Sequence, residues 1–278
     1  MTATTSDTRA TAPGSSLNSA LADGLVVTWR NLKRIPRIPE LAIFAILQSI
    51  MFVLLFAFVF GGAIDVPGAD YTSYLMPGIF VQTLTFATVT TAIGMAEDMN
   101  KGLIDRFRSL PMARSAVLSG RTTSDVVYNC LILFVLMATG LLVGWRVESG
   151  IFGFLAALGL MLVFAYAMSW LGVLLGLMVP TVEVAQQVGF IVLFPLTFVS
   201  NAFVPLDTMP PWLETLANWN PISAIVAACR ELFGNATIPV NDSFPMQHPE
   251  LMSTVWIGLA LLVFPPLAVR KYREAASR

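Results

Sequence analysis

Residues that could carry out catalysis are few and scattered in this 278-residue sequence. It contains one histidine, His248, and two cysteines, Cys130 and Cys229. A lone histidine beside a proline is more often a solvated side chain than a metal ligand, and isolated cysteines behave as small apolar residues. No cluster of His, Cys or carboxylate groups of the kind that hydrolases use is visible. We therefore predict neither a catalytic residue nor a metal site.

A nucleotide-binding motif is also absent from the sequence. There is no G-x-x-x-x-G-K-[ST] pattern, and no Gly-rich turn between a strand and a helix could cradle phosphates. The polar segments are too short to fold a nucleotide-binding domain, which normally needs on the order of 100 residues. We expect the chain to bind no cofactor itself. Energy from ATP and Mg²⁺ would have to come from a separate protein.

Long uncharged runs dominate the sequence, in which 56% of residues are hydrophobic and 12% are charged. A helix needs about 20 apolar residues to cross the hydrocarbon of a bilayer. The runs are too weakly alternating for barrel strands, so we expect an all-α polytopic membrane protein. Its six transmembrane helices, within residues 41–269, are predicted at Leu41–Phe60, Tyr71–Ala96, Val126–Trp145, Ser149–Val182, Val184–Leu206 and Leu251–Val269.

Lysine and arginine residues are concentrated on one side of the predicted bundle. Five precede the first run, five lie between the second and third runs, and four follow the last, against only Arg146 and Arg230 on the other side. Cationic loops stay in the cytoplasm, so both termini are expected there. Residues 1–16 are expected to form a disordered tail and residues 270–278 a basic tail. Aromatic residues expected at the outer headgroups are Tyr71, Tyr74, Trp145, Trp212 and Trp219.

An amphipathic helix is predicted at residues 17–40. Apolar residues, including Leu25 and Trp29, recur there at spacings of three or four, and Lys33 and Arg34 follow them. Such a helix would lie on the inner leaflet and contact anionic lipid, ahead of the first span. A soluble helix with a solvated basic end is the alternative.

Residues 97–118 form the most distinctive polar segment. Met99, Leu103, Phe107 and Leu110 share one helical face. Ser109 can cap a second short helix that contains Pro111 in its first turn. The pattern predicts a bent pair of cytoplasmic helices, with a plain solvated connection as the alternative. The polar and charged residues of this segment include Glu97, Asp98, Lys101, Asp105, Arg106, Arg108 and Arg114.

Residues 205–250 are too apolar for a plain external loop. After Asn220 and Pro221, apolar residues recur at helical spacing until Gly234. An external helical hairpin that dips toward the bilayer is expected, with Arg230 and Glu231 as polar groups at its edge. It would act as an exit lid, or else only cover the bundle.

Polar groups inside the predicted spans are mostly uncharged. Asp125 and Glu183 lie at span ends and can reach cytoplasmic water, so the chain lacks the intramembrane charges typical of proton-coupled transporters. Threonines of the second span are expected to hydrogen-bond between helices. Two G-x-x-x-G steps, Gly140–Gly144 and Gly172–Gly176, predict close helix packing.

The order of these features resembles that of type-2 ABC exporter permeases, and most closely the daunorubicin-resistance type of membrane subunit found in actinobacteria. The resemblance rests on the acidic end of the second span, Gly102, the apolar and basic alternation before Leu110-Pro111, and Asn220-Pro221-Ile222-Ser223 followed by Arg230. It implies a half-size permease in a bacterial cell membrane. This permease would pair with an identical or paralogous second chain and dock two separate ATPase subunits.

The resemblance also assigns roles to residues. Those implied to couple the permease to the ATPase are Lys101, Asp105, Arg106, Phe107, Arg108, Leu110, Pro111 and Arg114. Those implied to form a gate or lid are Glu97, Asp98, Asn220, Pro221, Arg230 and Glu231. The apolar spans favour export of an amphipathic drug or lipid-like substrate, and a polysaccharide or glycolipid cargo stays open. Membrane lipids are expected partners and nucleic acid is not. A secondary transporter or channel and a membrane-embedded lipid enzyme are the remaining alternatives.

Overall fold

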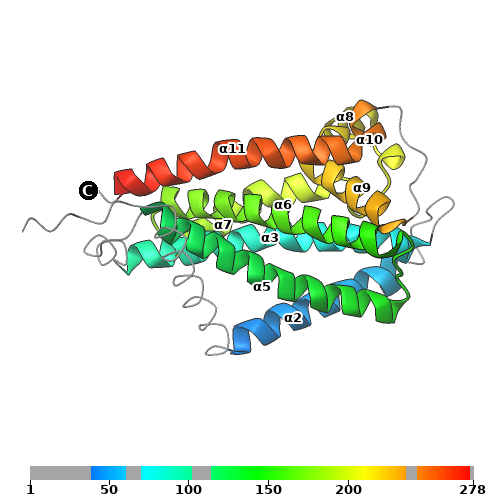
Figure 1. The fold of residues 1–278 in the computed structure, drawn as a ribbon, viewed down its shortest axis with the longest axis horizontal. Coiled ribbons are helices and arrows are strands. Elements are labelled where there is room, and N and C mark those ends of the chain that lie inside the picture. Colours follow the sequence, from blue (N-terminus) through cyan, green and yellow to red (C-terminus); the bar gives the residue numbers. More distant parts are fainter. Residues whose placement is uncertain (1–38, 61–69, 102–113, 236–242, 276–278) are drawn as a thin grey trace, which may run out of the picture.

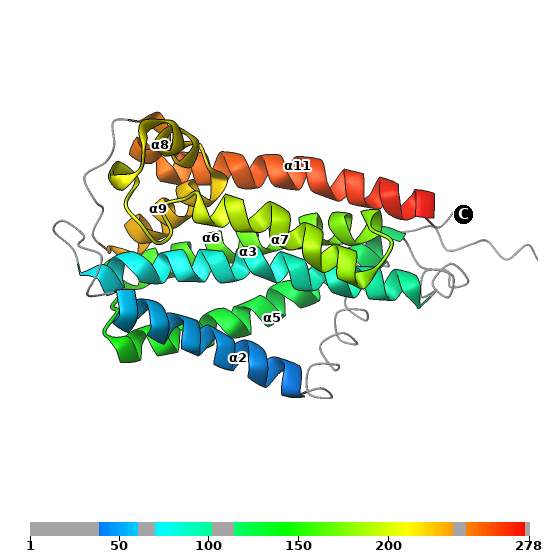
Figure 2. The same ribbon diagram turned by 180° about the vertical axis from the view of Figure 1, so that it is seen from behind.

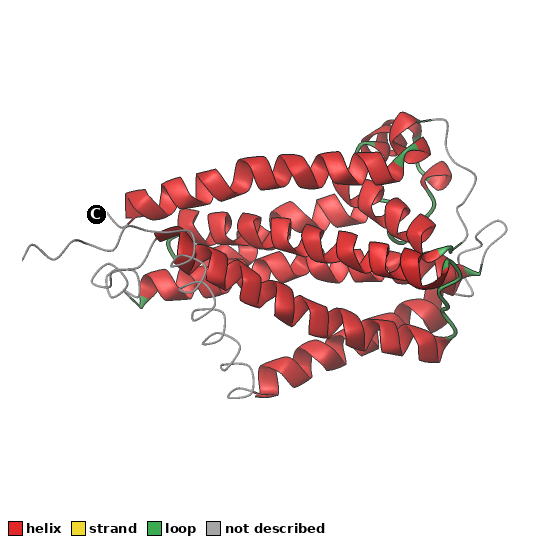
Figure 3. Cartoon of the chain, in the orientation of Figure 1, coloured by secondary structure: helices red, strands yellow, loops and turns green. Residues whose placement is uncertain are grey.

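Long helices run side by side along one axis in the computed structural model of the protein (Figures 1 and 2). The structure describes residues 39–60, 70–101, 114–235 and 243–275. Within these ranges every regular element is a helix, as Figure 3 shows by colour. The all-α class expected from the uncharged runs is therefore confirmed for the described residues. The predicted amphipathic helix of residues 17–40 falls outside them, except for its last two residues.

Each predicted span overlaps a long or apolar helix, although several of the helix ends differ from the predicted ones. These helices are α2 (Pro39–Leu54), which continues as the π-helix η2 (Leu55–Phe60), α3 (Tyr71–Asn100), α5 (Arg114–Val143), α6 (Gly150–Met178), α7 (Val182–Phe198) and α11 (Pro249–Ala275). Within the described residues, four stretches are long and apolar enough to cross a membrane: α3, residues Leu118–Val143 of α5, α6, and residues Pro249–Glu274 of α11. Shorter apolar helices are Leu47–Val59 and α7.

Short helices gather at one end of the bundle, beside the first turns of α11 (Figures 1 and 2). They are the 3₁₀ turn η3 (Leu206–Thr208), α8 (Pro211–Asn218), α9 (Pro221–Phe233) and α10 (Phe244–Gln247). Helix α9 packs against α3, α6 and α11. The apolar external insertion predicted at residues 205–250 is thus helical where the structure describes it, and it packs on the bundle rather than forming an open loop.

The fifth predicted span is shorter than expected, because α7 ends at Phe198 rather than at Leu206. The side-chain amide of Asn220 donates hydrogen bonds to the carbonyl oxygens of Leu196 and Val199, at 2.6 and 2.5 Å. These are carbonyls that no longer have partners where a helix ends. The side chain of Asn220, just before α9, therefore caps α7, and the apolar residues after α7 form a turn.

Glycines set the distance between α3 and α6. A Cβ atom on Gly172 would lie 2.6 Å from the carbonyl oxygen of Thr88, and one on Gly176 would lie 2.5 Å from that of Ala92. Real Cβ atoms do not approach a backbone so closely, so the two helices touch only because both positions are glycine. The close packing predicted for Gly172–Gly176 is confirmed. At the other predicted step Gly144 has a φ of 111° and ends α5 instead.

Aromatic residues expected at the outer headgroups are mostly inside the protein. Tyr71, Tyr74 and Trp145 are only 5%, 1% and 1% exposed, so these three side chains pack inside the bundle, and their expected depth at the outer headgroups stays a prediction. Trp145 packs edge-to-face on Phe80 and Phe233, and its indole N–H donates to the side-chain oxygen of Asn235 at 2.8 Å. This cluster attaches the end of α5 to α9. Exposed aromatic residues at the same end are Trp212 and Trp219.

Candidate functional site

Asn220 and Pro221 fix the start of α9. The side-chain oxygen of Asn220 accepts a hydrogen bond from the backbone N–H of Ile222 at 2.8 Å, which caps the helix. Pro221 occupies the first helical position, where its missing N–H costs nothing. Because the amide of Asn220 also caps α7, one residue joins the end of α7 to the beginning of α9. Gly234, with a φ of 74°, ends α9.

Arg230 lies at the centre of a buried polar cluster formed by Tyr74, Asn201, Ser223 and Arg230. We call it the outer hub after the side that the lysine and arginine distribution predicts for it. The guanidinium of Arg230 donates from Nε to the carbonyl oxygen of Tyr74 at 2.9 Å, and from Nη2 to that of Asn201 at 2.7 Å. Its Cζ lies 3.5 Å from the centre of the Tyr74 ring, a cation–π contact. The hub thereby holds α9 against α3 and the turn after α7.

The remaining groups of the outer hub complete its hydrogen bonds. The hydroxyl of Tyr74 donates to the carbonyl oxygen of Asn201 at 2.7 Å, and the hydroxyl of Ser223 accepts from the N–H of Asn201 at 3.2 Å. Burial lowers the pKa of Arg230 and its contact with Tyr74 opposes that shift. Arginine nevertheless keeps its proton in proteins, so the hub holds a buried positive charge.

The predicted place of Arg230 at the edge of a lid is therefore wrong, since its side chain is only 4% exposed. The helical pattern of α9 placed the apolar residues on one face, but it did not show that a turn after α7 brings carbonyl oxygens over Arg230. Glu231, the next residue, is exposed as expected. Tyr74 and Asn201 were not predicted as functional residues. The one signal for them was a single arginine beside the apolar face of this helix.

A second polar cluster lies at the opposite end of α3, where α3 and α5 meet. Its members are Thr91, Asp98, Arg121 and Asp125. We call it the cytoplasmic cluster after the side that the lysine and arginine distribution predicts for it. Arg121 of α5 forms an ion pair with Asp98 of α3, and the hydroxyl of Thr91 donates to the carboxylate of Asp125 at 2.8 Å. Gly94 leaves room for Arg121, because a Cβ atom there would overlap the guanidinium. Helix α3 thus supplies both the opposite charge and the space that Arg121 of α5 requires.

The structure describes only some of the residues predicted for the gate and the coupling surface. Asp98 joins the cytoplasmic cluster, whereas Glu97 pairs with Lys101 on the exposed side of α3 at 3.2 Å. Arg114 opens α5, and residues 114–118 continue into that helix instead of forming a separate short one. Predicted residues that lie outside the described ranges are Leu25, Trp29, Lys33, Arg34, Asp105, Arg106, Phe107, Arg108, Leu110 and Pro111.

The sequence pattern identified Arg121 only as one of the predicted cytoplasmic cations and did not reveal its ion pair with Asp98. Threonines of α3 were expected to form hydrogen bonds between helices. Among the α3 threonines whose hydroxyl forms a hydrogen bond in the structure, only Thr91 bonds to another helix. The hydroxyls of Thr83 and Thr85 donate to the carbonyl oxygens four residues earlier in their own helix, at 2.8 Å each. This bonding is common for threonine in apolar helices because it satisfies the hydroxyl locally.

A charge exchange tests the Asp98–Arg121 pair. We expect Asp98→Arg alone to destabilise the protein by about 1–3 kcal/mol, since it places two arginines side by side in a half-buried position. Combining it with Arg121→Asp should restore most of the loss. Thermal melting of the detergent-purified chain measures both. Glu97→Arg is the matched control because its carboxylate is exposed, and a shift as large as that of Asp98→Arg there would contradict the assignment.

These features define a multi-pass helical membrane protein with polar clusters at both ends of one helix. Residues 24–233 match the family of the ABC-2 type transporter, and the chain belongs to that family. It is 33% identical to the daunorubicin resistance ABC transporter permease protein DrrB1 of Streptomyces coeruleorubidus, over 92% of this chain and 88% of the relative. It is therefore the permease subunit of an ABC exporter, and its family implies a partner ATP-binding subunit.

More distant relatives agree with this class. The chain is 25% identical to the probable doxorubicin resistance ABC transporter permease protein DrrC of Mycobacterium tuberculosis, over 95% of this chain and 94% of the relative. It is 26% identical to the putative transport permease ycf38 of Cyanophora paradoxa, over 76% of this chain and 74% of the relative. The similarity therefore covers nearly the whole chain rather than one segment of it.

Proposed function

We propose that this chain is a six-span half-size permease that moves an amphipathic drug or lipid-like molecule out of the cytoplasm or inner leaflet. The observation that carries the proposal is the family match over residues 24–233, combined with relatives named for daunorubicin and doxorubicin resistance. Four stretches long and apolar enough to cross a membrane, with two shorter apolar helices, support the six spans.

Two copies of an ATP-binding subunit would drive transport by pushing on the segment between α3 and α5. Helix α3 has 30 residues. At 1.5 Å per residue it is about 45 Å long, against about 30 Å of hydrocarbon, so it extends beyond the bilayer. The Asp98–Arg121 pair joins α3 to α5 near that extension. A force applied to residues 102–113 would therefore reach both helices together.

We also propose the remaining partners from the family resemblance, and the orientation from the positions of the lysine and arginine residues. A second permease chain, identical or paralogous, would complete the transport path. The chain would bind no nucleotide, and ATP and Mg²⁺ would stay on the ATP-binding subunits. Of the 16 lysine and arginine residues, only Arg146 and Arg230 lie on the side without the coupling segment. Both termini would thus be cytoplasmic in a bacterial plasma membrane.

The Phe107→Asp substitution tests this function. We expect it to abolish ATP-driven transport while the chain still reaches the membrane, because a charge would break the apolar face that links the ATP-binding subunit to the bundle. Efflux of a fluorescent anthracycline from cells that express the chain with its ATP-binding subunit measures the effect. Phe107→Leu is the matched control and should transport normally. Normal efflux by Phe107→Asp would remove this segment from the coupling path.

A further inference from the structure

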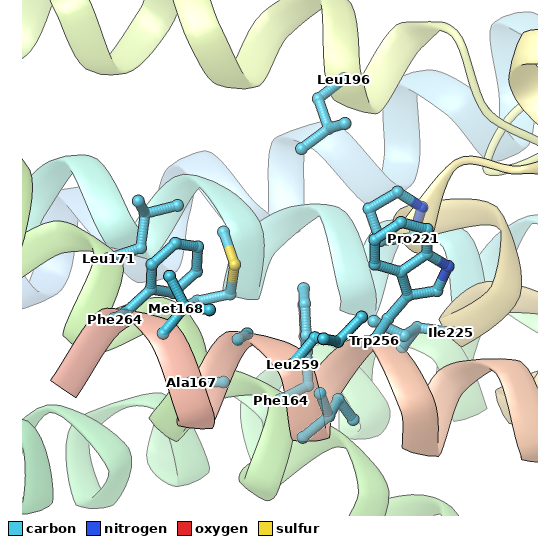
Figure 4. A pocket seen from close by; sticks show the side chains of 13 residues that line it. Phe164, Ala167, Met168, Leu171, Leu196, Pro221, Ile225, Trp256, Leu259 and Phe264 are labelled. Atoms are coloured by element: carbon cyan, nitrogen blue, oxygen red, sulfur yellow. The ribbon is translucent and has the colours of Figure 1, made fainter. Parts of the chain in front are cut away.

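An apolar groove of about 320 Å³ lies between α7 and α11, with α6 as its floor and α9 at one end (Figure 4). Phe164 and Met168 of α6 line the floor, and Leu196 of α7 lies across from α11. Ile225 and Trp256 lie near one end, and Phe264 lies near the other. The only polar side-chain atom among the lining residues is the indole nitrogen of Trp256. The groove thus offers hydrocarbon contact and almost nothing else.

The α11 wall of the groove lies at the surface of the single chain. The floor of the groove is deeply buried, since Ala167 is 1% exposed, whereas Leu259 and Val263 on its α11 side are 48% and 40% exposed. The same strip of α11 carries Leu262, which is 73% exposed and does not line the groove. A lipid chain beside α11 would therefore have direct lateral access.

The size and direction of the groove suit a hydrocarbon chain. From Trp256 to Phe264 it follows α11 for eight residues, or about 12 Å along the helix axis. An apolar cavity of about 150 Å³ already binds benzene, and apolar cavities stay dry.

The apolar lining of the groove also favours a lipid chain over a polar ligand. Sites for drug-like molecules normally include a few placed polar groups that fix orientation. Among the lining residues only Trp256 has a polar side-chain atom; this nitrogen is buried and has no hydrogen-bond partner within the described residues, and no second polar group lies beside it to fix the orientation of a ligand. An acyl chain needs no such group, and filling the groove restores the dispersion contacts that its lining would lack.

We propose that this groove binds one acyl chain of a membrane phospholipid, held between α6, α7 and α11 and touching α9 at Pro221 and Ile225. The bound lipid would belong to each permease chain as a structural component. It would stabilise the position of α9, which carries Arg230. This binding does not depend on ATP or on the transported substrate, so it stands apart from the proposed function.

Fluorescence quenching by a brominated lipid tests the proposal. The full chain is purified in detergent, stripped of lipid, and titrated with phosphatidylcholine that carries bromine in one acyl chain. The contribution of Trp256 is obtained by comparison with Trp256→Phe. We expect its emission to be quenched in a saturable manner, with a single lipid per chain at saturation. Unbrominated phosphatidylcholine should compete and reverse the quenching.

Groove-filling variants separate this site from general lipid contact. Ala260→Phe and, independently, Val263→Phe should abolish the saturable quenching, whereas Leu262→Phe on the same helix should leave it unchanged. Melting curves establish that each variant is folded. Quenching that rises without saturation and is equal in all variants would overturn the proposal. Absent quenching, with Ala260→Phe dissociating a dimer of the chain, would assign the groove to a second copy and overturn it as well.

Discussion

Arg230→Met is expected to lower the melting temperature of the purified protein by about 10 °C, corresponding to on the order of 3 kcal/mol. The guanidinium donates to carbonyl oxygens of Tyr74 and Asn201 inside the protein, where water cannot replace it. Methionine fills similar space but donates nothing, so buried acceptors lose their partner and the cation–π contact is lost. ATP-driven efflux should fall in parallel, because α9 would no longer be held against α3.

Controls for the outer hub distinguish hydrogen bonding from charge. Arg230→Lys keeps a positive charge but not the planar fork, so we expect an intermediate loss. Tyr74→Phe keeps the ring beneath Arg230 and removes only the hydroxyl bond to Asn201, which should cost about 1 kcal/mol. Glu231→Gln alters the exposed neighbour and should change nothing measurable. A melting temperature for Arg230→Met close to that of the unaltered protein would contradict the central place given to Arg230.

Gly172→Ala is expected to destabilise the protein by about 1–3 kcal/mol, although it adds only one methyl group. That methyl would lie 2.6 Å from the carbonyl oxygen of Thr88 and 2.8 Å from the Cβ of Thr91. Neither neighbour can rotate away, since one atom is backbone and the other is fixed to it. The helices must then separate, which also disturbs the hydrogen bond from Thr91 to Asp125.

Gly159→Ala is the matched control for Gly172→Ala. It lies in the same helix, and a Cβ atom there meets nothing within 4 Å. Alanine also favours a helix over glycine, so this variant should be equally stable or slightly more stable. Thermal melting of the two variants side by side makes the comparison. Equal melting temperatures would show that α3 and α6 are not in close contact at Gly172.

The spans were predictable from the sequence because crossing hydrocarbon requires a long uncharged run, and that requirement is local. Helix α3 begins at Tyr71 and α6 begins one residue after the expected Ser149. Close packing at Gly172–Gly176 was also predictable, since small residues four apart lie on one helical face. Where the sequence misled, at the end of α7, the cause was a cap supplied by Asn220 from 21 residues further along the chain.

The polar clusters were only partly predictable, because their partners are distant in sequence. Arg230 bonds to Tyr74, which is 156 residues away, and Asp98 pairs with Arg121 from the next helix. A periodic pattern shows which residues share a face, but not what covers that face. Tyr74 was expected at the headgroups for the same reason, since an aromatic residue near a span end fits either a lipid boundary or a buried contact.

Helix α3 carries members of both clusters and therefore connects them mechanically. Tyr74 of the outer hub and Asp98 of the cytoplasmic cluster lie on this one helix, 24 residues or about 36 Å apart. A push at the Asp98 end of α3 would therefore reach the contact between α3 and α9 at the other end. This continuity agrees with a permease that does no chemistry of its own and is moved by a partner.

Reconstitution into liposomes tests that claim most directly. The purified chain is inserted alone, or together with its ATP-binding subunit, and both ATP hydrolysis and uptake of a fluorescent anthracycline are measured. We predict that neither activity occurs with the chain alone, and that both appear only when the ATP-binding subunit is present. ATP hydrolysis by the chain alone, or uptake driven by an ion gradient without ATP, would contradict the account.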